Sequence, residues 1–297
     1  MRKTFANPYL LLSLTALFWS GNMVIGRGIT ESAPPVALAF WRWVVAFALV
    51  LPFALPHLRS QSAQLRTHWK AVVVLGVLGV GCYNTFAYVA LQYTTATNAT
   101  MLNSFIPIAT IALAFVFLGK RLSGLEALGV VASLLGVLTI VGKGSVDTLM
   151  AFRLNTGDLW MLVAVLTWGV YTVGLQWRPQ GVHPMLMLAA FIVVGLLALA
   201  PFYAYELHQG RTLLVTPTTV VAILYVGTFA SFLGFVFYNA GIAAVGSNRG
   251  ALFIHLMPVF GTLLAAVFLG ERPYWYHFVG ILLVFLGIYL TTRRPAG

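Results

Sequence analysis

The sequence predicts an all-α polytopic membrane protein of ten transmembrane helices, arranged as two inverted five-helix repeats. Three observations carry this prediction. Hydrophobic residues fill 60% of the 297 positions and charged residues only 8%, whereas soluble domains carry about 25% charged residues. Apolar runs of about 20 residues, the length that crosses a ~30 Å hydrocarbon core, follow one another along the chain. The third observation is an internal duplication.

The apolar runs fall into ten segments that we expect to be helical. In chain order they are 9–28, 35–56, 69–92, 98–118, 124–142, 158–177, 184–204, 218–243, 248–269 and 275–292. The first follows a basic MRK but is too long for the apolar core of a signal peptide, so we expect an uncleaved first helix. The longest connections, 57–68, 143–157 and 205–217, hold polar residues and are too short for a water-soluble domain.

The distribution of lysine and arginine predicts the orientation. With the N-terminus in the cytoplasm, eleven of these cations fall on the inner side and five on the outer side, and Arg42 lies inside a span, away from its ends. Cytoplasmic loops of membrane proteins carry the excess of basic residues. Both termini are therefore expected in the cytoplasm of a multi-pass protein, and we expect a bacterial inner membrane.

The duplication is clearest in one apolar stretch that occurs twice, 151 residues apart. Residues 106–121 read IPIATIALAFVFLGKR and residues 257–272 read MPVFGTLLAAVFLGER, with eight of sixteen positions identical. At a shift of 149, Trp19 matches Trp168 and Pro35 matches Pro184. Because each copy holds five helices, an odd number, the second copy enters from the opposite face. We expect repeats at 1–146 and 147–297.

The paired Pro…V-F-L-G-(K/E)-R segments, each before a glycine-containing last helix, resemble the duplicated EamA unit of the drug/metabolite transporter superfamily. Within it, the chain looks most like the YddG-type exporters of aromatic and other neutral amino acids. The resemblance implies ten helices, cytoplasmic termini, alternating access around a midplane cavity and no cofactor. It therefore implies a secondary transporter that exports neutral, apolar or aromatic amino acids or similar metabolites.

The positions of the acidic residues bear on coupling. All six lie in loops or near the expected helix ends: Glu31, Glu126, Asp147, Asp158, Glu206 and Glu271. An intramembrane carboxylate is the usual carrier of protons and anchor of cations. We therefore expect an uncoupled carrier, with a proton-coupled metabolite or drug exporter as an alternative. A phosphorylated-sugar or nucleotide-sugar exchanger on the same fold is another, although it would require more cations than Arg42 and Arg249.

Two residues stand out as ionisable groups inside apolar segments. Arg42 lies about eight residues into the second segment, where a guanidinium needs a cavity, water or a partner. It could receive a substrate carboxylate, or it could snorkel to the outer interface beside Trp41 and Trp43. His255 lies one turn before Pro258. It could bind substrate or shuttle protons, or it could bond a neighbouring helix carbonyl.

Aromatic and amide side chains supply the other candidate substrate-binding residues. Trp19 and Asn22 share a helix face, and Trp168 with Tyr171 repeat that spacing. Polar residues of the third, fourth and eighth segments complete the set: Tyr83, Asn84, Tyr88, Asn98, Asn103, Tyr238 and Asn239. Asparagine amides can bind both ends of a zwitterion without adding charge. The alternative for all of these residues is packing between helices.

Prolines in corresponding places predict points of flexure. Pro107 and Pro258 are expected to free a carbonyl within a helix and to act as hinges, or to be static kinks. Glycines around 76–81 and at Gly227 and Gly234 permit close approach or bending of helices.

The sequence also argues against several classes of protein. Cys82 is the only cysteine, so the chain alone can form neither a disulfide framework nor a thiolate metal site. The sequence contains neither paired carboxylates nor a metal-ligand spacing of the kind that would predict an enzyme. The basic residues occur one to three at a time, without the patch that nucleic-acid binding requires. A channel would suit a ring of subunits better than one duplicated chain. We expect a monomer in the lipid bilayer that handles a small-molecule substrate, with no metal.

Overall fold

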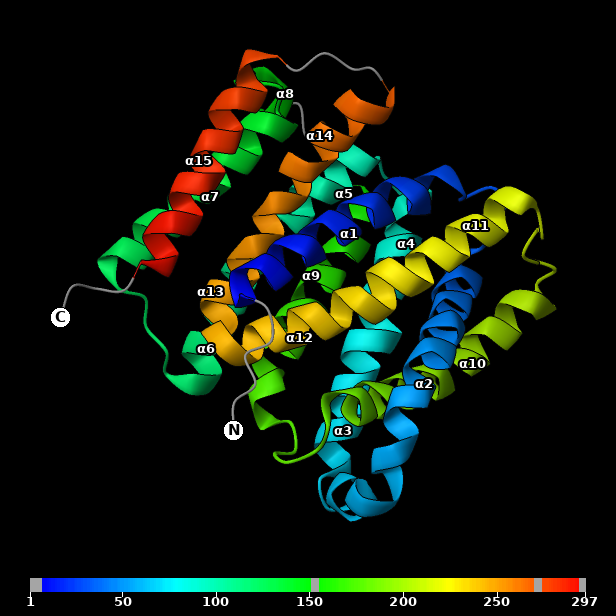
Figure 1. Cartoon of the computed structure of the whole chain (residues 1–297). Helices are drawn as coiled ribbons and strands as arrows, with labels where there is room; N and C mark the ends of the chain where they lie inside the picture. The colour runs from blue at the N-terminus through cyan, green and yellow to red at the C-terminus, as the bar shows by residue number, and fades with distance from the viewer. Residues whose placement is uncertain (1–6, 151–154, 270–273, 294–297) are drawn as a thin grey trace.

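The computed structural model describes residues 7–150, 155–269 and 274–293, and throughout these ranges the chain is helical with no strand. The α-helices are α1 (Pro8–Gly28), α2 (Pro35–Thr67), α3 (Trp69–Gly76), α4 (Tyr83–Tyr93), α5 (Ala96–Asn103), α6 (Ile106–Leu118), α7 (Gly124–Val141), α8 (Val146–Met150), α9 (Thr156–Gly174), α10 (Pro184–His208), α11 (Pro217–Tyr225), α12 (Gly234–Val245), α13 (Ser247–Ala251), α14 (Leu256–Leu269) and α15 (Trp275–Thr292). Figure 1 shows them as a single bundle.

Four further helices of other types accompany these α-helices. η1 (Val77–Cys82) and η3 (Val226–Leu233) are π-helices, whereas η2 (Leu175–Trp177) and η4 (Leu252–His255) are 3₁₀-helices. The two π-helices each lie in the middle of a long segment, the third and the eighth of the predicted ten. A π-helix widens the turn and leaves carbonyl groups free for side-chain donors.

Nine helical segments of the described chain are long and apolar enough to cross a membrane, judged by length and composition. The chain is therefore a multi-pass membrane protein. The remaining predicted segment, 248–269, is divided into α13, η4 and α14, and α14 has only 14 residues. A tenth span thus stays a prediction. Several residues used for the orientation and acid counts lie outside the described ranges: Arg2, Lys3, Arg153, Glu271, Arg272 and Arg294.

The second helix is longer than predicted. The apolar run ends near residue 56, but α2 continues through Pro52 and Pro56 to Thr67. The added turns are polar, and Gln61 there accepts a hydrogen bond from the His183 backbone at 2.7 Å. This tertiary contact holds a helical end that hydrophobicity does not indicate. We call residues 57–67 the α2 extension.

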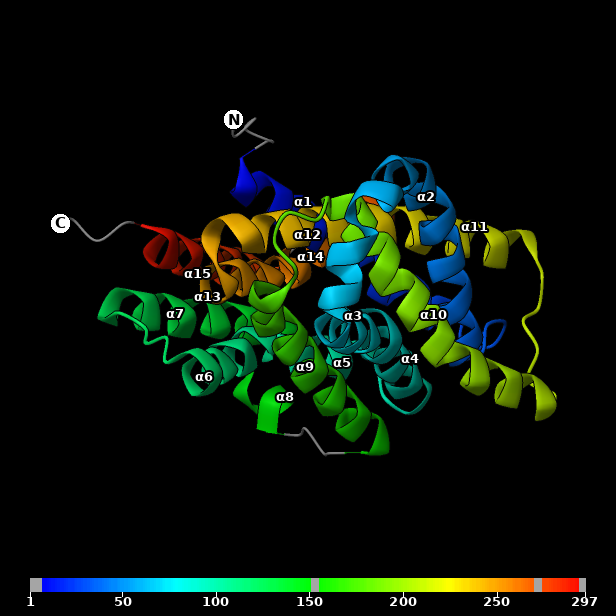
Figure 2. The same cartoon turned by 90° about the horizontal axis from the view of Figure 1, so that it is seen from below.

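The long helices pack as antiparallel pairs, and α7 with α15 forms the tightest of them (Figures 1 and 2). A Cβ atom on Gly129 would lie 2.6 Å from the Gly287 carbonyl oxygen, and one on Gly136 would lie 2.6 Å from that of Gly280. Both contacts are too short for any side chain, so the pair requires glycine at these places. The pairs α2 with α10, α4 with α9 and α1 with α12 surround the interior of the protein.

Candidate functional site

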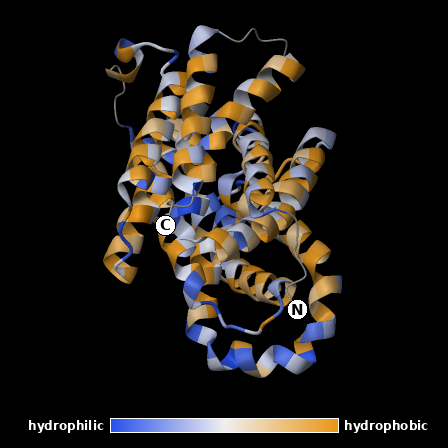
Figure 3. Cartoon of the chain, turned by 60° about the vertical axis from the view of Figure 1, so that its left-hand side comes forward, coloured by the Kyte–Doolittle hydropathy of each residue, from blue (hydrophilic) through white to orange (hydrophobic). Residues whose placement is uncertain are grey.

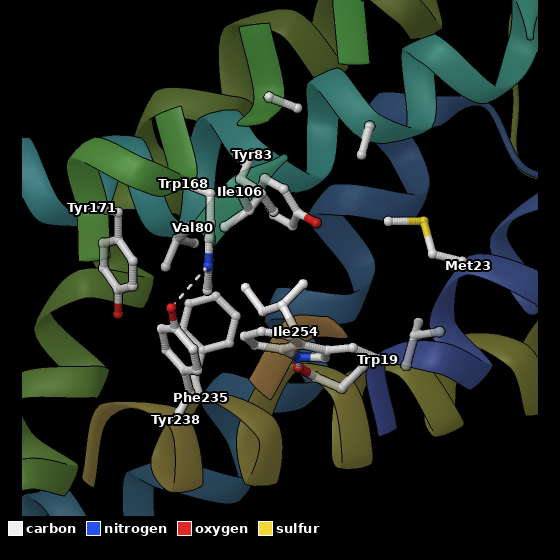
Figure 4. Close-up of a cluster of buried hydrophobic side chains, with 14 of the residues drawn as sticks. Trp19, Met23, Val80, Tyr83, Ile106, Trp168, Tyr171, Phe235, Tyr238 and Ile254 are labelled. Carbon is white, nitrogen blue, oxygen red and sulfur yellow. Dashed lines mark hydrogen bonds between the residues drawn. The ribbon is translucent and has the colours of Figure 1, made fainter. Parts of the chain in front are cut away.

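Six aromatic side chains meet at the centre of the bundle (Figure 4). They are Trp19 from α1, Tyr83 from α4, Trp168 and Tyr171 from α9, and Phe235 and Tyr238 from α12, and each is at most 7% exposed. We call them the aromatic cluster. Trp168 is central to it: its ring lies 5.0 Å from that of Trp19, nearly perpendicular, and 4.7 Å from that of Tyr83. Edge-to-face contacts of this kind favour close packing of aromatic rings.

The cluster is closed in this conformation. A small void beside Trp19, bounded also by Tyr238 and Ile254, has no room for a water molecule. The rings of the cluster therefore pack directly against one another, and a solute could enter among them only if they separated.

Polar atoms of the aromatic cluster are satisfied by named partners. Trp19 donates its indole N–H to the Ala230 carbonyl at 2.9 Å, inside the π-helix η3. The Tyr238 hydroxyl lies 2.9 Å from the Thr172 hydroxyl and accepts a 3.3 Å bond from the Trp168 indole. The π-helix thus supplies the carbonyl that fixes one ring of the cluster.

Arg42 lies beside the aromatic cluster and is only 1% exposed, so the expected alternative of snorkelling to the interface is wrong. Its Nε donates to the Ser231 hydroxyl at 2.6 Å. Its Nη1 donates to Asn84 Oδ1 at 2.7 Å, to Asn22 Oδ1 at 3.2 Å and to the Tyr88 hydroxyl. We call these five residues the arginine cluster. It joins α1, α2, α4 and η3 around one cation.

All four partners of Arg42 are neutral. Among the described residues, the carboxylate groups that are buried are bound elsewhere. Asp158 accepts from Thr94 and caps α9, while Glu206 accepts the Ala37 backbone N–H at 2.8 Å. The ion pair found among the described residues joins Arg249 to Glu126, and both are remote in sequence from Arg42. The guanidinium charge is therefore uncompensated within the described structure, a costly arrangement unless an anion joins it.

The arginine cluster also has more donors than acceptors. Asn84 must turn its oxygen toward the guanidinium, since its amide group would face a donor in the other rotamer. Its Nδ2 is then buried without a hydrogen-bond partner among the described residues, as is the indole N–H of the adjacent Trp43. The Arg42 guanidinium lies 5.6 Å from the Trp43 ring. A buried donor without an acceptor costs about 1–3 kcal/mol, so this corner of the protein would gain from an acceptor-rich group such as a carboxylate.

Most of the predicted site residues converge here, with two amides reaching the aromatic cluster through its tyrosines. The Tyr83 hydroxyl donates to Asn103 Oδ1 at 2.8 Å, and the Tyr171 hydroxyl donates to Asn239 Oδ1 at 2.9 Å. Asn98 is the exception. It lies in the first turn of α5, where its backbone N–H is capped by Thr95, and the structure gives its side chain no bond to either cluster.

His255 is placed apart from both clusters. Its Nε2 lies 2.8 Å from the Ser104 carbonyl oxygen, and its Nδ1 lies 2.8 Å from the Ser133 hydroxyl. A carbonyl can only accept, so Nε2 carries a hydrogen. The ring joins η4 to α7 and to the end of α5, which is the alternative of a histidine satisfied by a helix carbonyl.

The two predicted hinge prolines do not lie inside continuous helices. Pro107 occupies the first turn of α6, directly after the chain breaks between α5 and α6. Pro258 occupies the first turn of α14, directly after η4. In a first turn the missing N–H of proline would have no intrahelical partner in any case. The prediction that each proline frees a carbonyl in mid-helix is therefore wrong, because the helices begin where the prolines stand.

Sequence reasoning missed Ser231, Thr172 and the two π-helices. Ser231 binds Arg42 and also donates to the Val226 carbonyl at 2.8 Å, five residues back, as the wider π turn allows. The available signal was the glycine content of both segments. A Cβ on Gly79, in η1, would lie 2.4 Å from the Tyr171 ring, so a glycine there makes room for an aromatic side chain of the cluster.

Comparison with known proteins identifies the family. The EamA-like transporter family matches residues 7–142 and again residues 155–293. The chain is a member of this family. An uncharacterized transporter of Archaeoglobus fulgidus is 31% identical over 97% of this chain and 98% of its own length. The uncharacterized transporter YyaM of Bacillus subtilis is 25% identical over 95% of this chain and 92% of its own. The family match, together with two relatives named as transporters, supports membrane transport of small metabolites as the activity.

Two more distant matches extend the comparison. A chloroplastic WAT1-related protein of Arabidopsis thaliana is 24% identical over 97% of this chain and 69% of its own length. A solved crystal structure has the same fold, with a TM-score of 0.77 and 19% identity over 97% of each chain.

Proposed function

We propose that this EamA-family transporter exports neutral amino acids with apolar or aromatic side chains, by alternating access and without a coupling ion. The observation that carries the proposal is a buried, uncompensated guanidinium next to a closed set of aromatic rings. Trp43 links the two, because its ring lies 5.6 Å from the Arg42 guanidinium and 4.7 Å from the Phe235 ring. A carboxylate would pair with Arg42 and accept from the spare donors around it. An apolar side chain would replace ring–ring contacts in the aromatic cluster.

The ammonium group of such a solute is expected to bind neutral groups. The oxygens of Asn22 and Tyr88 lie in the arginine cluster, and ring faces of the aromatic cluster attract cations. Because the described residues place no buried carboxylate at the site, a purely cationic drug would meet the repulsion of Arg42 without an anionic partner. This favours the zwitterion over a cationic substrate, and one buried arginine favours a carboxylate over a sugar phosphate with two negative charges.

The helix pairs support a duplicated, inverted arrangement with repeats at 1–146 and 147–297. Gly129 and Gly280 correspond in the two copies, as do Gly136 and Gly287, and the contacts between α7 and α15 are crossed between these pairs. Crossed contacts of this kind arise when a two-fold axis relates the copies. We accordingly propose cytoplasmic termini in a bacterial inner membrane, a monomeric carrier and a rocking motion of the two copies about the site.

The test is counterflow in liposomes that contain the purified protein. We expect phenylalanine, tryptophan and methionine to exchange, and 3-phenylpropionate to compete more strongly than 2-phenylethylamine, because it keeps the carboxylate and the amine does not. An imposed pH gradient should leave the flux unchanged. Movement of sugar phosphates without movement of these amino acids would overturn the substrate class, and a strong response to the pH gradient would overturn the uncoupled mechanism.

A further inference from the structure

A cavity of about 320 Å³ lies between α2, α3 and α10, away from both clusters. All of its lining residues are apolar, among them Leu51, Leu55 and Leu58 on α2, and Leu186, Ala190 and Val193 on α10. Leu55, Leu58 and Val193 are 53%, 44% and 41% exposed. Since these helices cross the membrane, the cavity opens sideways toward lipid and not toward water.

The cavity is bounded at one end by the α2 extension. Gln61 and Gln64 of this extension lie against the turn before α10, through the bond to the His183 backbone and a contact with Gly181. Leu65 also belongs to the lining. One end of the apolar cavity is therefore closed by polar turns, which Figure 3 shows as hydrophilic residues gathered at the bottom of the molecule.

Cations continue the α2 side of the cavity into this polar region. Arg59 follows Leu55 by four residues and Arg66 follows Arg59 by seven, so all three occupy one face of the helix. Both arginines are exposed, as is Lys70 at the start of α3, whose ammonium lies 6.0 Å from the Trp69 ring. Residues 35–93 contain no acidic residue, so these charges have no anionic partner on α2, α3 or α4.

An apolar slot that opens to lipid and ends at cations without an ion-pair partner among the described residues matches one kind of molecule. We propose that it binds an anionic phospholipid, with one acyl chain between α2 and α10 and the phosphate headgroup at Arg59 and Arg66. Basic pockets between helices recognise anionic headgroups, at about 1 kcal/mol for each lysine or arginine near the surface. The site is independent of the proposed solute.

Native mass spectrometry of the purified full chain tests the proposal, with phosphatidylglycerol and phosphatidylcholine of matched acyl chains as probes. We expect at least one phosphatidylglycerol bound about 30-fold more tightly than phosphatidylcholine. The double variant R59Q/R66Q should bind both lipids equally. Its control, K120Q/R121Q, loses the same charge in the loop between α6 and α7 and should keep the preference.

Filling the slot tests the acyl-chain half of the proposal. Ala190→Trp, or the smaller Ala190→Leu if the first does not fold, should weaken binding of both lipids. Leu197→Trp, on a 70% exposed position of α10 outside the lining, should leave binding unchanged. Equal affinity of the native protein for the two lipids, an unchanged preference in R59Q/R66Q, or unchanged binding in both Ala190 variants would overturn the proposal and leave only unspecific lipid around the protein.

Discussion

The two sides of the candidate site occupy corresponding places in the duplicated sequence and differ in chemistry. At the shift of 149, Arg42 corresponds to Phe191 and Asn22 corresponds to Tyr171. On the first side the arginine is bonded to amides and hydroxyls. On the second, Tyr171 packs edge-on against Phe191 with ring centroids 6.4 Å apart.

In the proposed transporter, the duplicated helices would form the scaffold, and this difference between the two sides would set the selectivity for solutes. The duplicated framework places side chains at equivalent positions around the site, and divergence has made one side polar and cationic and the other aromatic. A molecule with a carboxylate at one end and an apolar group at the other fits such a pair of surfaces. A symmetric site would fit a symmetric solute. The variants below therefore change the side chains that make the two sides different.

The largest effect is expected from Arg42→Gln, which removes the charge that distinguishes the two sides. Flux of phenylalanine should fall by at least about 100-fold, since a charged pair in a buried site is worth about 3 kcal/mol or more. Thermal stability in detergent should hold or rise, because an uncompensated buried cation is lost. Phe191→Leu is the matched control and should keep most of the flux. Substantial flux in Arg42→Gln would contradict the role given to the cation.

Asn84→Asp tests the charge difference between the two sides of the site, because it adds a negative charge with almost no change in side-chain volume. The new carboxylate would pair with Arg42 in place of the substrate, so flux should fall on the order of tenfold while the melting temperature rises. Asn239→Asp is the matched control, since Asn239 aligns with Asn84 at a shift of 155 and bonds only Tyr171. Equal losses in the two variants would mean that the sides are not distinguished by charge.

Trp168→Leu tests whether the aromatic side of the site recognises aromatic solutes. The change removes the ring that contacts Trp19, Tyr83 and Tyr238. We expect several-fold weaker exchange of phenylalanine and tryptophan, with alanine less affected, because an aromatic pair contributes about 0.5–1.5 kcal/mol beyond its area. Counterflow across the three solutes measures this. A uniform loss for all of them would point to packing and not to recognition.

The smallest effect is expected on stability, from the contacts at the two ends of the helix pair α2 and α10. Glu206 caps the start of α2, whereas its counterpart His57 stacks on His183, at the start of α10, with ring centroids 3.9 Å apart. Burial, and then the nearby His57, lower the pKa of His183. The unfolded chain therefore binds this proton more readily, and stability is lost as the pH falls through and below about 6.5.

Thermal unfolding in detergent at pH 7.5 and 5.0 measures this loss of stability at the contact between His57 and His183. We expect a difference on the order of 1–2 °C from this group, reduced in His183→Gln. An identical pH dependence in the variant would show that the stacked ring makes no contribution.

Composition, run length and the internal duplication were enough to predict a multi-pass helical membrane protein, and the resemblance of the paired Pro…V-F-L-G-(K/E)-R segments to the EamA unit pointed to the drug/metabolite transporter superfamily. Every membrane-spanning helix must be hydrophobic over the thickness of the bilayer. The positions of the spans can therefore be read from consecutive residues of the sequence, without knowing which helices pack together. The same signals also selected Arg42, Asn22, Asn84 and Trp168, because a polar or aromatic group is conspicuous in an apolar run.

Only the tertiary structure decided how these residues combine. It placed Asn98 apart, joined His255 to Ser104 and Ser133, added Ser231 and Thr172, and put Pro107 and Pro258 in the first turns of α6 and α14. These outcomes depend on which donor meets which acceptor across helices, and on where a π or 3₁₀ turn relieves packing. Neither is encoded in the hydrophobicity of a single segment, since the partner lies on another helix, in Arg42's case 189 residues away.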